Sequence, residues 1–106
     1  MFDVVKNLGR RELSITSVAL RHRVTPRYIQ KLFESEGTTF TEYVLEQRLI
    51  EADRILSDPR FADRTISDVA YKVGFGDLSY FSRVFRRRFT MTPSDAREQA
   101  RRERDV

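Results

Sequence analysis

Two sets of polar side chains recur along this chain with the same internal spacing. They are Arg27, Gln30, Lys31 and Glu34 in the first set, and Ser79, Ser82, Arg83 and Arg86 in the second. Every member of the second set follows its counterpart by 52 positions. The spacing of i, i+3, i+4 and i+7 places four side chains on one face of an α-helix. Because most of these side chains donate hydrogen bonds, the pattern favours recognition of an acceptor-rich surface.

The polar sets belong to segments whose other side is apolar. The apolar residues are Ile29, Leu32 and Phe33 in the first segment, and Phe81, Val84 and Phe85 in the second. Phe and Leu at helical spacing almost always pack into a core. We therefore expect two amphipathic helices with these apolar residues buried.

A shorter helix is expected before each of these segments. The residues Ser14-Ile15, Val18 and Ala19 return 51 positions later as Thr65-Ile66, Val69 and Ala70. Ser14 and Thr65 are suited to cap a helix, and Asp68 completes a capping box with Thr65. The small Ala19 and Ala70 allow the paired helices to approach closely.

The turns inside the two copies differ by one residue. The first copy turns through Arg23-Val24-Thr25, where Thr25 is expected as a cap and Pro26 occupies the first helical position. The second copy turns through Gly74-Phe75-Gly76, whose glycines can adopt positive φ. Each copy is therefore predicted to form a helix, a short turn and a second helix.

One longer helix is expected between the copies, over residues 40–56. We expect Thr41 to cap this helix, Asp58-Pro59 to end it, and residues 57–64 to form a polar loop. Its predicted apolar stripe is Leu45, Leu49, Ala52 and Leu56. A helix of this length is rigid and would fix the position of one copy relative to the other.

The chain as a whole is predicted to be all-α, with seven helices in one bundle-like domain over residues 1–106. A first short helix is indicated by Phe2, Val5 and Leu8, and a last helix begins at Thr92-Pro93. The predicted subdomains are a first helix-turn-helix at about 14–36, a linking helix at about 41–57, and a second helix-turn-helix at about 65–88.

Composition excludes several classes of function. The 106 residues include no Cys and a single His, His22, so disulfides, thiolate zinc sites and a His cluster are excluded. We expect no catalytic residue, no metal and no cofactor. No apolar run approaches the roughly 20 residues of a membrane span, and no leader is visible. A cytoplasmic protein without membrane contact is therefore expected.

The two repeated polar faces fit the major groove of double-stranded DNA. Arg and Lys can donate to guanine O6 and N7, and Gln can pair with adenine. Phosphate contacts are assigned to Thr25, Arg86, Arg87 and Arg88. The whole net charge of +4 arises after residue 58, which agrees with an acidic partner. The linking helix, about 24 Å long, would be a spacer of nearly one DNA turn, which is about 34 Å.

Three other functions fit the sequence less well. A protein-docking module could use the same helical repeat, and its binding would depend only weakly on salt. RNA binding is disfavoured because Tyr and Phe are expected on core faces, which leaves no exposed stacking platform. An enzyme is disfavoured because the acid pairs Glu51 with Asp53 and Asp63 with Asp68 are expected on solvated surfaces.

Three stretches carry a family resemblance: LSITSVALRHRVTPRYIQKLFESEG, YVLEQRLIEADRILSD and TISDVAYKVGFGDLSYFSRVFRRRFTMTPSDAR. Together they resemble the DNA-binding domain of the AraC/XylS family of bacterial transcription regulators. The resemblance covers about residues 13–97, and the pattern in the third stretch is highly specific to that family.

The resemblance implies a seven-helix fold, two recognition helices in adjacent major grooves on one DNA face, and activation through contact with RNA polymerase. It places base contacts at Arg27, Gln30 and Lys31 in the first recognition helix, and at Leu78, Ser79, Ser82 and Arg83 in the second. Most members of the family also carry an effector-binding or dimerisation domain. We expect such a domain to be absent from this chain, which is then either a piece of a longer regulator, the reading that we favour, or a stand-alone member.

Two positions depart from the family pattern. Arg23 stands where Gly commonly follows the first short helix, and Thr90 stands where Gly usually precedes the Pro turn. If either residue adopts a positive φ, the strain costs about 1 kcal/mol.

Overall fold

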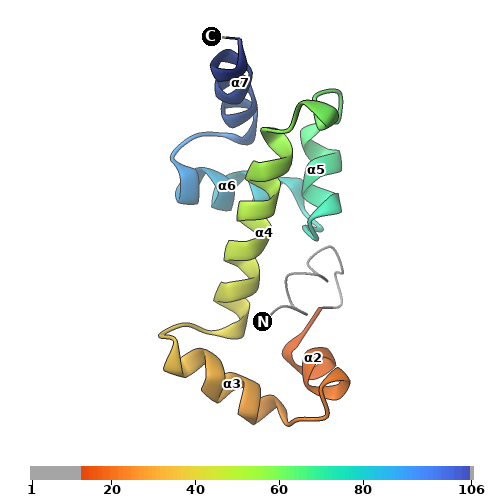
Figure 1. Ribbon diagram of the computed structural model, residues 1–106, viewed down its shortest axis with the longest axis vertical. Coiled ribbons are helices and arrows are strands. Elements are labelled where there is room, and N and C mark those ends of the chain that lie inside the picture. The colour runs from red at the N-terminus through yellow and green to blue at the C-terminus, as the bar shows by residue number, and fades with distance from the viewer. Residues whose placement is uncertain (1–12, 106) are drawn as a thin grey trace.

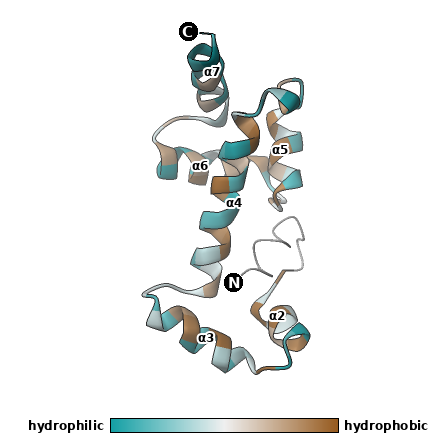
Figure 2. Cartoon of the chain, in the orientation of Figure 1, coloured by the Kyte–Doolittle hydropathy of each residue, from teal (hydrophilic) through white to brown (hydrophobic). Residues whose placement is uncertain are grey.

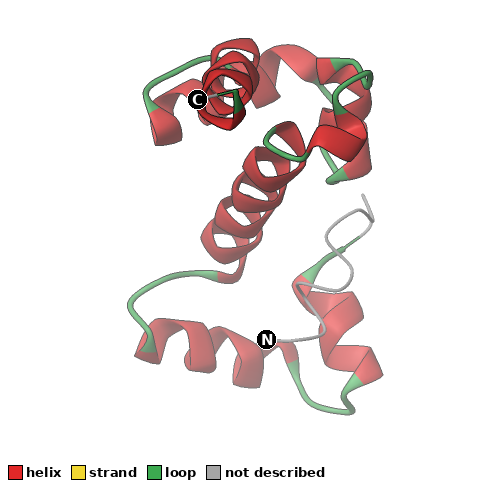
Figure 3. Ribbon diagram, turned by 45° about the horizontal axis from the view of Figure 1, so that its top comes forward, coloured by secondary structure: helices red, strands yellow, loops and turns green. Residues whose placement is uncertain are grey.

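The computed structural model describes residues 13–105, and this part of the chain is helical without strands (Figure 1 and Figure 3). Its elements are α2 (Ile15–Arg21), α3 (Pro26–Ser35), α4 (Phe40–Leu56), η1 (Pro59–Phe61, a 3-10 helix), α5 (Ile66–Lys72), α6 (Leu78–Phe89) and α7 (Pro93–Arg104). The all-α prediction is confirmed, with six α-helices in the described part. The short helix expected at Phe2, Val5 and Leu8 lies outside the described residues.

The helices begin where side chains satisfy their first free amide groups. In α2 and α5 the capping boxes are complete, because Ser14 pairs with Ser17 and Thr65 with Asp68 through reciprocal hydrogen bonds of 2.9–3.3 Å. Thr25 caps α3, with Pro26 at the first helical position as predicted. Thr92 likewise caps α7, which confirms the expected start of the last helix.

The predicted cap of α4 is wrong by two residues. Thr39, not Thr41, has the extended backbone of a cap, and its hydroxyl oxygen accepts from the Glu42 amide at 3.1 Å. The helix therefore starts at Phe40, which is buried, whereas Thr41 is an exposed residue inside the first turn. Thr39 and Thr41 carry the same hydroxyl group, and the helix uses the earlier one, which leaves Phe40 at the first helical position.

The expected polar loop after α4 contains a short helix of its own. Residues Pro59–Phe61 form η1, which Asp58 caps through the Arg60 amide at 2.9 Å. The ring of Phe61 is partly buried against the core formed by α4 to α7. The loop prediction is corrected in this respect, because a single aromatic side chain anchors an otherwise polar segment.

The buried residues among positions 13–105 form two clusters, which lie at the two ends of α4. Figure 1 shows α2 and α3 at one end of α4, with α5, α6 and α7 at the other. The first core is made by Val18, Ala19, Ile29, Phe33, Phe40 and Val44. The second core is made by Leu49, Ala52, Ile55, Leu56, Val69, Ala70, Val73, Phe75, Phe81, Val84, Phe85 and Ala96. We call α2 with α3 the first unit, and α5 with α6 the second unit.

Helix α4 contributes to both cores, but through different faces. Its first half gives Phe40 and Val44 to the first core, and its second half gives Leu49 and Ala52 among others to the second. Leu49 follows Val44 by five positions, which places it roughly 140° further around the helix. The single stripe predicted from Leu45 to Leu56 is therefore correct only for the second core, where Leu45 is partly buried.

Leu32 is a second correction to the predicted core. It is 40% exposed, although Ile29 and Phe33 of the same helix are buried. Its counterpart in the second unit, Val84, is buried at 9% exposure. Among residues 13–105, four α-helices contribute side chains to the second core and three to the first, and Leu32 lies at the exposed edge of α3. Figure 2 shows the mixed hydropathy of α3.

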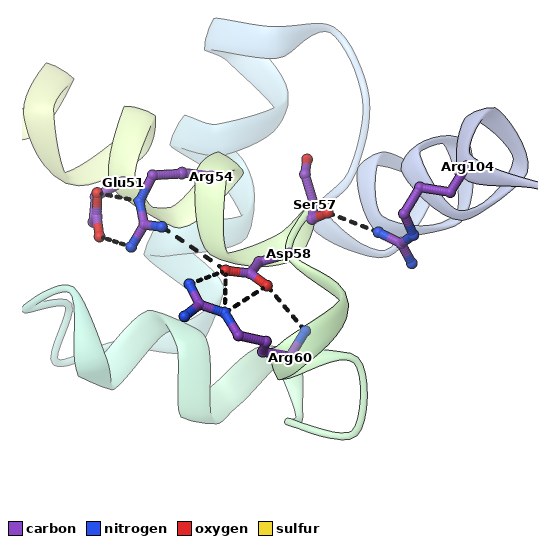
Figure 4. Close-up of polar contacts among 6 residues, drawn as sticks. All are labelled: Glu51, Arg54, Ser57, Asp58, Arg60 and Arg104. Carbon is purple, nitrogen blue, oxygen red and sulfur yellow. Dashed lines mark hydrogen bonds and ion pairs between the residues drawn. The ribbon is translucent and has the colours of Figure 1, made fainter.

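Polar contacts join the C-terminal end of α4 to the elements that follow it (Figure 4). Arg60 donates to the Asp58 carboxylate at 2.7 Å, and Arg104 of α7 donates to the Ser57 carbonyl at 2.7 Å. The hydrogen bonds from Arg60 lower the pKa of Asp58 to about 2. These contacts hold η1 and α7 at the C-terminal end of the long helix.

Candidate DNA-binding surface

The first polar set gathers on one outward face of α3. Arg27, Gln30, Lys31 and Glu34 are all exposed, and together they line a shallow hollow of about 250 Å³. Thr25 and Pro26 fix the start of this helix, and Ile29 and Phe33 fasten its other side to the first core. The structure therefore brings together the three residues of α3 predicted to contact bases.

The second polar set lies at the equivalent place on α6. Ser79, Arg83 and Arg86 are exposed, and Leu78 at the start of the helix is 38% exposed. Ser82 is partly buried, so it is the least accessible of the predicted base contacts. The guanidinium carbon of Arg83 lies 6.0 Å from the ring centre of Tyr80, three residues earlier in the same helix.

The two units turn in the same way at the level of individual hydrogen bonds. The Val24 amide donates to the Ala19 carbonyl at 3.0 Å, and the Phe75 amide donates to the Ala70 carbonyl at 2.9 Å. The preceding residues, Arg23 and Gly74, adopt φ of 55° and 104°. The extra residue of the second turn is thus Gly76. A positive φ was predicted as possible at both glycines of this turn, and only Gly74 adopts one.

Both departures from the family pattern fall on strained backbone. Arg23 has φ of 55°, and Thr90, which ends α6, has φ of 62°. Each residue is in the left-handed region that favours glycine, as anticipated from the glycine that the family places there. The fold keeps its turns at these two positions in spite of the strain.

The four residues predicted to contact phosphates differ in how available they are. Thr25, Arg86 and Arg87 are exposed, and neither arginine forms an ion pair within residues 13–105. Arg88 instead donates to both carboxylate oxygens of Glu46 on α4, at 2.7 and 2.9 Å. This ion pair ties α6 to α4 across 42 positions of sequence, so no local spacing could have revealed it.

The tyrosines overturn one premise of the argument against RNA binding. Tyr28, Tyr71 and Tyr80 are exposed by 53%, 45% and 41%, although they had been expected on core faces. The phenylalanines Phe33, Phe40, Phe75, Phe81 and Phe85 are buried as expected. A tyrosine can keep its ring against the protein and its hydroxyl in water, which a pattern of apolar residues does not reveal.

Glu51 and Asp53, one of the acid pairs considered from the sequence, have separate surroundings in the structure. Residues 13–105 contain no group of three potential metal ligands, and no helix among them could cross a membrane. Glu51 pairs with Arg54 at 2.6 Å rather than with Asp53. Asp53 is partly buried, which raises its pKa, while the charge of Arg88 acts in the opposite direction.

Comparison with known proteins finds a helix-turn-helix family and transcription regulators among the relatives of this chain. A family model described as a helix-turn-helix domain matches residues 18–99. The transcriptional activator RhrA of Rhizobium meliloti is 50% identical over 97 residues, covering 92% of this chain. The activator RhaS of Citrobacter koseri is 35% identical over 88 residues, covering 82% of this chain. The chain spans 31% of the length of each of these two relatives.

Solved structures show the same fold. A DNA-binding transcriptional dual regulator from Escherichia coli K-12 superimposes with a TM-score of 0.79 at 27% identity, covering 92% of this chain and 90% of that one. A regulator from Chromobacterium violaceum, described as having an AraC-type DNA-binding domain, gives 0.78 at 29% identity, with 92% and 88% covered. The sequence and structural matches agree, and the chain belongs to the AraC-type helix-turn-helix family of DNA-binding transcription regulators.

Proposed function

We propose that this chain reads two successive major grooves on one face of double-stranded DNA, with α3 in one groove and α6 in the next. The observation that carries the proposal is the matched pair of outward polar faces, which repeat at one offset of 52. They lie on helices at opposite ends of α4, in a molecule 48 Å long (Figure 1). The molecule is therefore long enough for its two ends to reach grooves that are one DNA turn, or roughly 34 Å, apart.

The proposed roles divide the surface into base contacts and phosphate contacts. Base edges are read by Arg27, Gln30 and Lys31 from α3, and by Leu78, Ser79, Ser82 and Arg83 from α6. Phosphates are bound by Thr25, Arg86 and Arg87. Arg88 also binds a DNA phosphate once it releases the Glu46 carboxylate. In this proposal the chain binds DNA and catalyses no reaction.

The regulatory outcome that we propose is activation in the cytoplasm through contact with RNA polymerase. Two relatives that are named transcriptional activators support this proposal, at 50% and 35% identity. Both are about three times as long as this chain, so the match covers about one third of each of them. In the proposal the present chain supplies the DNA contact.

Selection from random duplexes tests the proposal directly. The purified chain should enrich one asymmetric site, and footprinting should show protection in two grooves on one face. The logarithm of affinity should fall linearly with the logarithm of salt concentration, because bound phosphates release counterions. Absence of any enriched site, together with salt-independent binding to a protein partner, would contradict DNA reading and favour the docking module.

A further inference from the structure

Two exposed tyrosines occupy the same position in both recognition helices. Tyr28 of α3 and Tyr80 of α6 are 52 residues apart, the offset of the polar sets. Each is the third residue of its helix, and its amide donates to the capping side chain, Thr25 or Asp77, at 3.1 Å. The repeat therefore places an exposed aromatic residue at the same position of both helices.

The helix geometry places both tyrosines at the edge of the reading face. A residue three positions away is rotated by roughly 60°, so Tyr28 lies beside Lys31, and Tyr80 lies beside Arg83. The contact between Arg83 and the ring of Tyr80 agrees with this arrangement. Arg87 follows Tyr80 by seven positions and lies on the same stripe of α6. When a helix lies in a major groove, the middle of its outward face meets the base edges. The two sides of that face meet the phosphates along the walls of the groove.

The hydroxyls of these tyrosines are available for a ligand. Within residues 13–105, neither the Tyr28 nor the Tyr80 hydroxyl takes part in a hydrogen bond with the protein. The ring of Tyr80 packs 6.2 Å from that of Phe75, which limits its motion. A phenol on a stiff two-bond side chain can donate to an anionic oxygen at low entropic cost.

We propose that Tyr28 and Tyr80 each donate a hydrogen bond to a backbone phosphate at the wall of the groove that their helix enters. The two hydroxyls fix the depth and register at which the polar faces meet the bases. They are positioning residues, since phosphate contacts carry no sequence information. This inference rests on the proposed DNA binding and adds the pair of contacts that aligns both recognition helices.

Tyrosine-to-phenylalanine variants isolate the hydroxyls. Tyr28→Phe and Tyr80→Phe should each weaken binding to the selected site about tenfold, as expected for one lost hydrogen bond to a charged group. Their preferences among base pairs should remain those of the wild type. Tyr71→Phe is the matched control, because Tyr71 is exposed on α5 outside the polar faces, and it should keep wild-type affinity. Circular dichroism verifies that all three variants are folded.

Neutral phosphates then locate each contact. Duplexes with one methylphosphonate at a time should reveal a position in each groove that weakens the wild type but has no further effect on the matching Tyr→Phe variant. Unchanged affinity of both variants, or a methylphosphonate profile identical to that of the wild type, would refute the tyrosine contacts and leave DNA reading intact. Failure of the wild type to prefer any duplex would instead refute the proposed function.

Discussion

Single residues in this chain carry backbone strain that glycine would relieve. Thr90 ends α6 with φ of 62°, and a β-branched residue is disfavoured there by about 1–2 kcal/mol. Glycine would remove this cost but add about 0.5–1 kcal/mol of unfolded-state entropy. We expect Thr90→Gly to raise the free energy of unfolding by about 0.5–1 kcal/mol.

Urea unfolding measures this effect, and Gly74 offers a control of opposite sign. Gly74→Ala places a side chain at φ of 104° in a buried turn, so its free energy of unfolding should decrease. A Thr90→Gly variant no more stable than the wild type would show that the surrounding contacts, and not the backbone, determine stability at this turn.

Residues on the reading face should differ from residues beside it in what their loss changes. Gln30→Ala should cost about 1–3 kcal/mol on the selected site and relax the preference at particular base pairs, because one base-edge contact disappears. Arg87→Ala should weaken binding to all duplexes similarly and flatten the salt dependence, as loss of a phosphate contact does. Repeating the site selection with each variant measures both effects. Identical preference profiles for the wild type and Gln30→Ala would remove Gln30 from the base contacts.

At the scale of elements, α4 is the part on which both units depend. Its first half gives side chains to one core and its second half to the other, and Val44 and Leu49 lie roughly 140° apart around the helix. One Ala inserted after Gln47 would rotate Leu49 and all that follows by roughly 100° and advance it by about 1.5 Å. Either one of the two cores loses its packing, or α6 no longer reaches the DNA groove that we propose for it.

Both outcomes should reduce specific affinity by about 1,000-fold or more, to the level that charge alone supplies. Mobility shift measures the affinity, and circular dichroism distinguishes unfolding from misplacement. Gln47→Ala is the matched control, because it changes the same site without changing the register, and it should bind like the wild type. An insertion variant with wild-type helicity and affinity would mean that the two units act independently.

The junction after α4 should respond to acid. The Arg60 contacts lower the pKa of Asp58 to about 2, below its ordinary value of 3.8. A carboxyl with a lowered pKa contributes stability above its ordinary pKa, and this contribution is lost as the pH falls toward the folded-state value. The stability of the wild type should therefore decrease between about pH 4 and pH 2 more than that of Asp58→Asn. Urea midpoints across this range measure the difference, and parallel curves would show that the pair contributes nothing.

At the scale of the whole molecule, the two units follow one another head to tail along one chain. A single chain should therefore protect an asymmetric site over two successive major grooves. Footprinting together with the stoichiometry of the shifted complex measures this arrangement. An obligatory palindrome bound by two chains would contradict it, because twofold symmetry would then come from a pair of molecules and not from the internal repeat.

The sequence by itself determined the six α-helices of the described residues, the repeat and the composition of both polar faces. These follow from local rules: the capping side chains at Ser14 and Thr65, the helical spacing of Phe81 and Phe85, and the offset that aligns Gln30 with Ser82. Such signals lie within one or two helical turns, so they can be recognised without the fold.

Only the tertiary structure decided which residues of these helices meet a neighbour. It exposed Leu32 while burying Val84, moved the cap of α4 from Thr41 to Thr39, and joined Arg88 to Glu46. It also divided the interior into two cores that share α4. Each of these outcomes depends on how many elements cover a given face, and a periodic pattern along one helix contains no information about the helices that will pack against it.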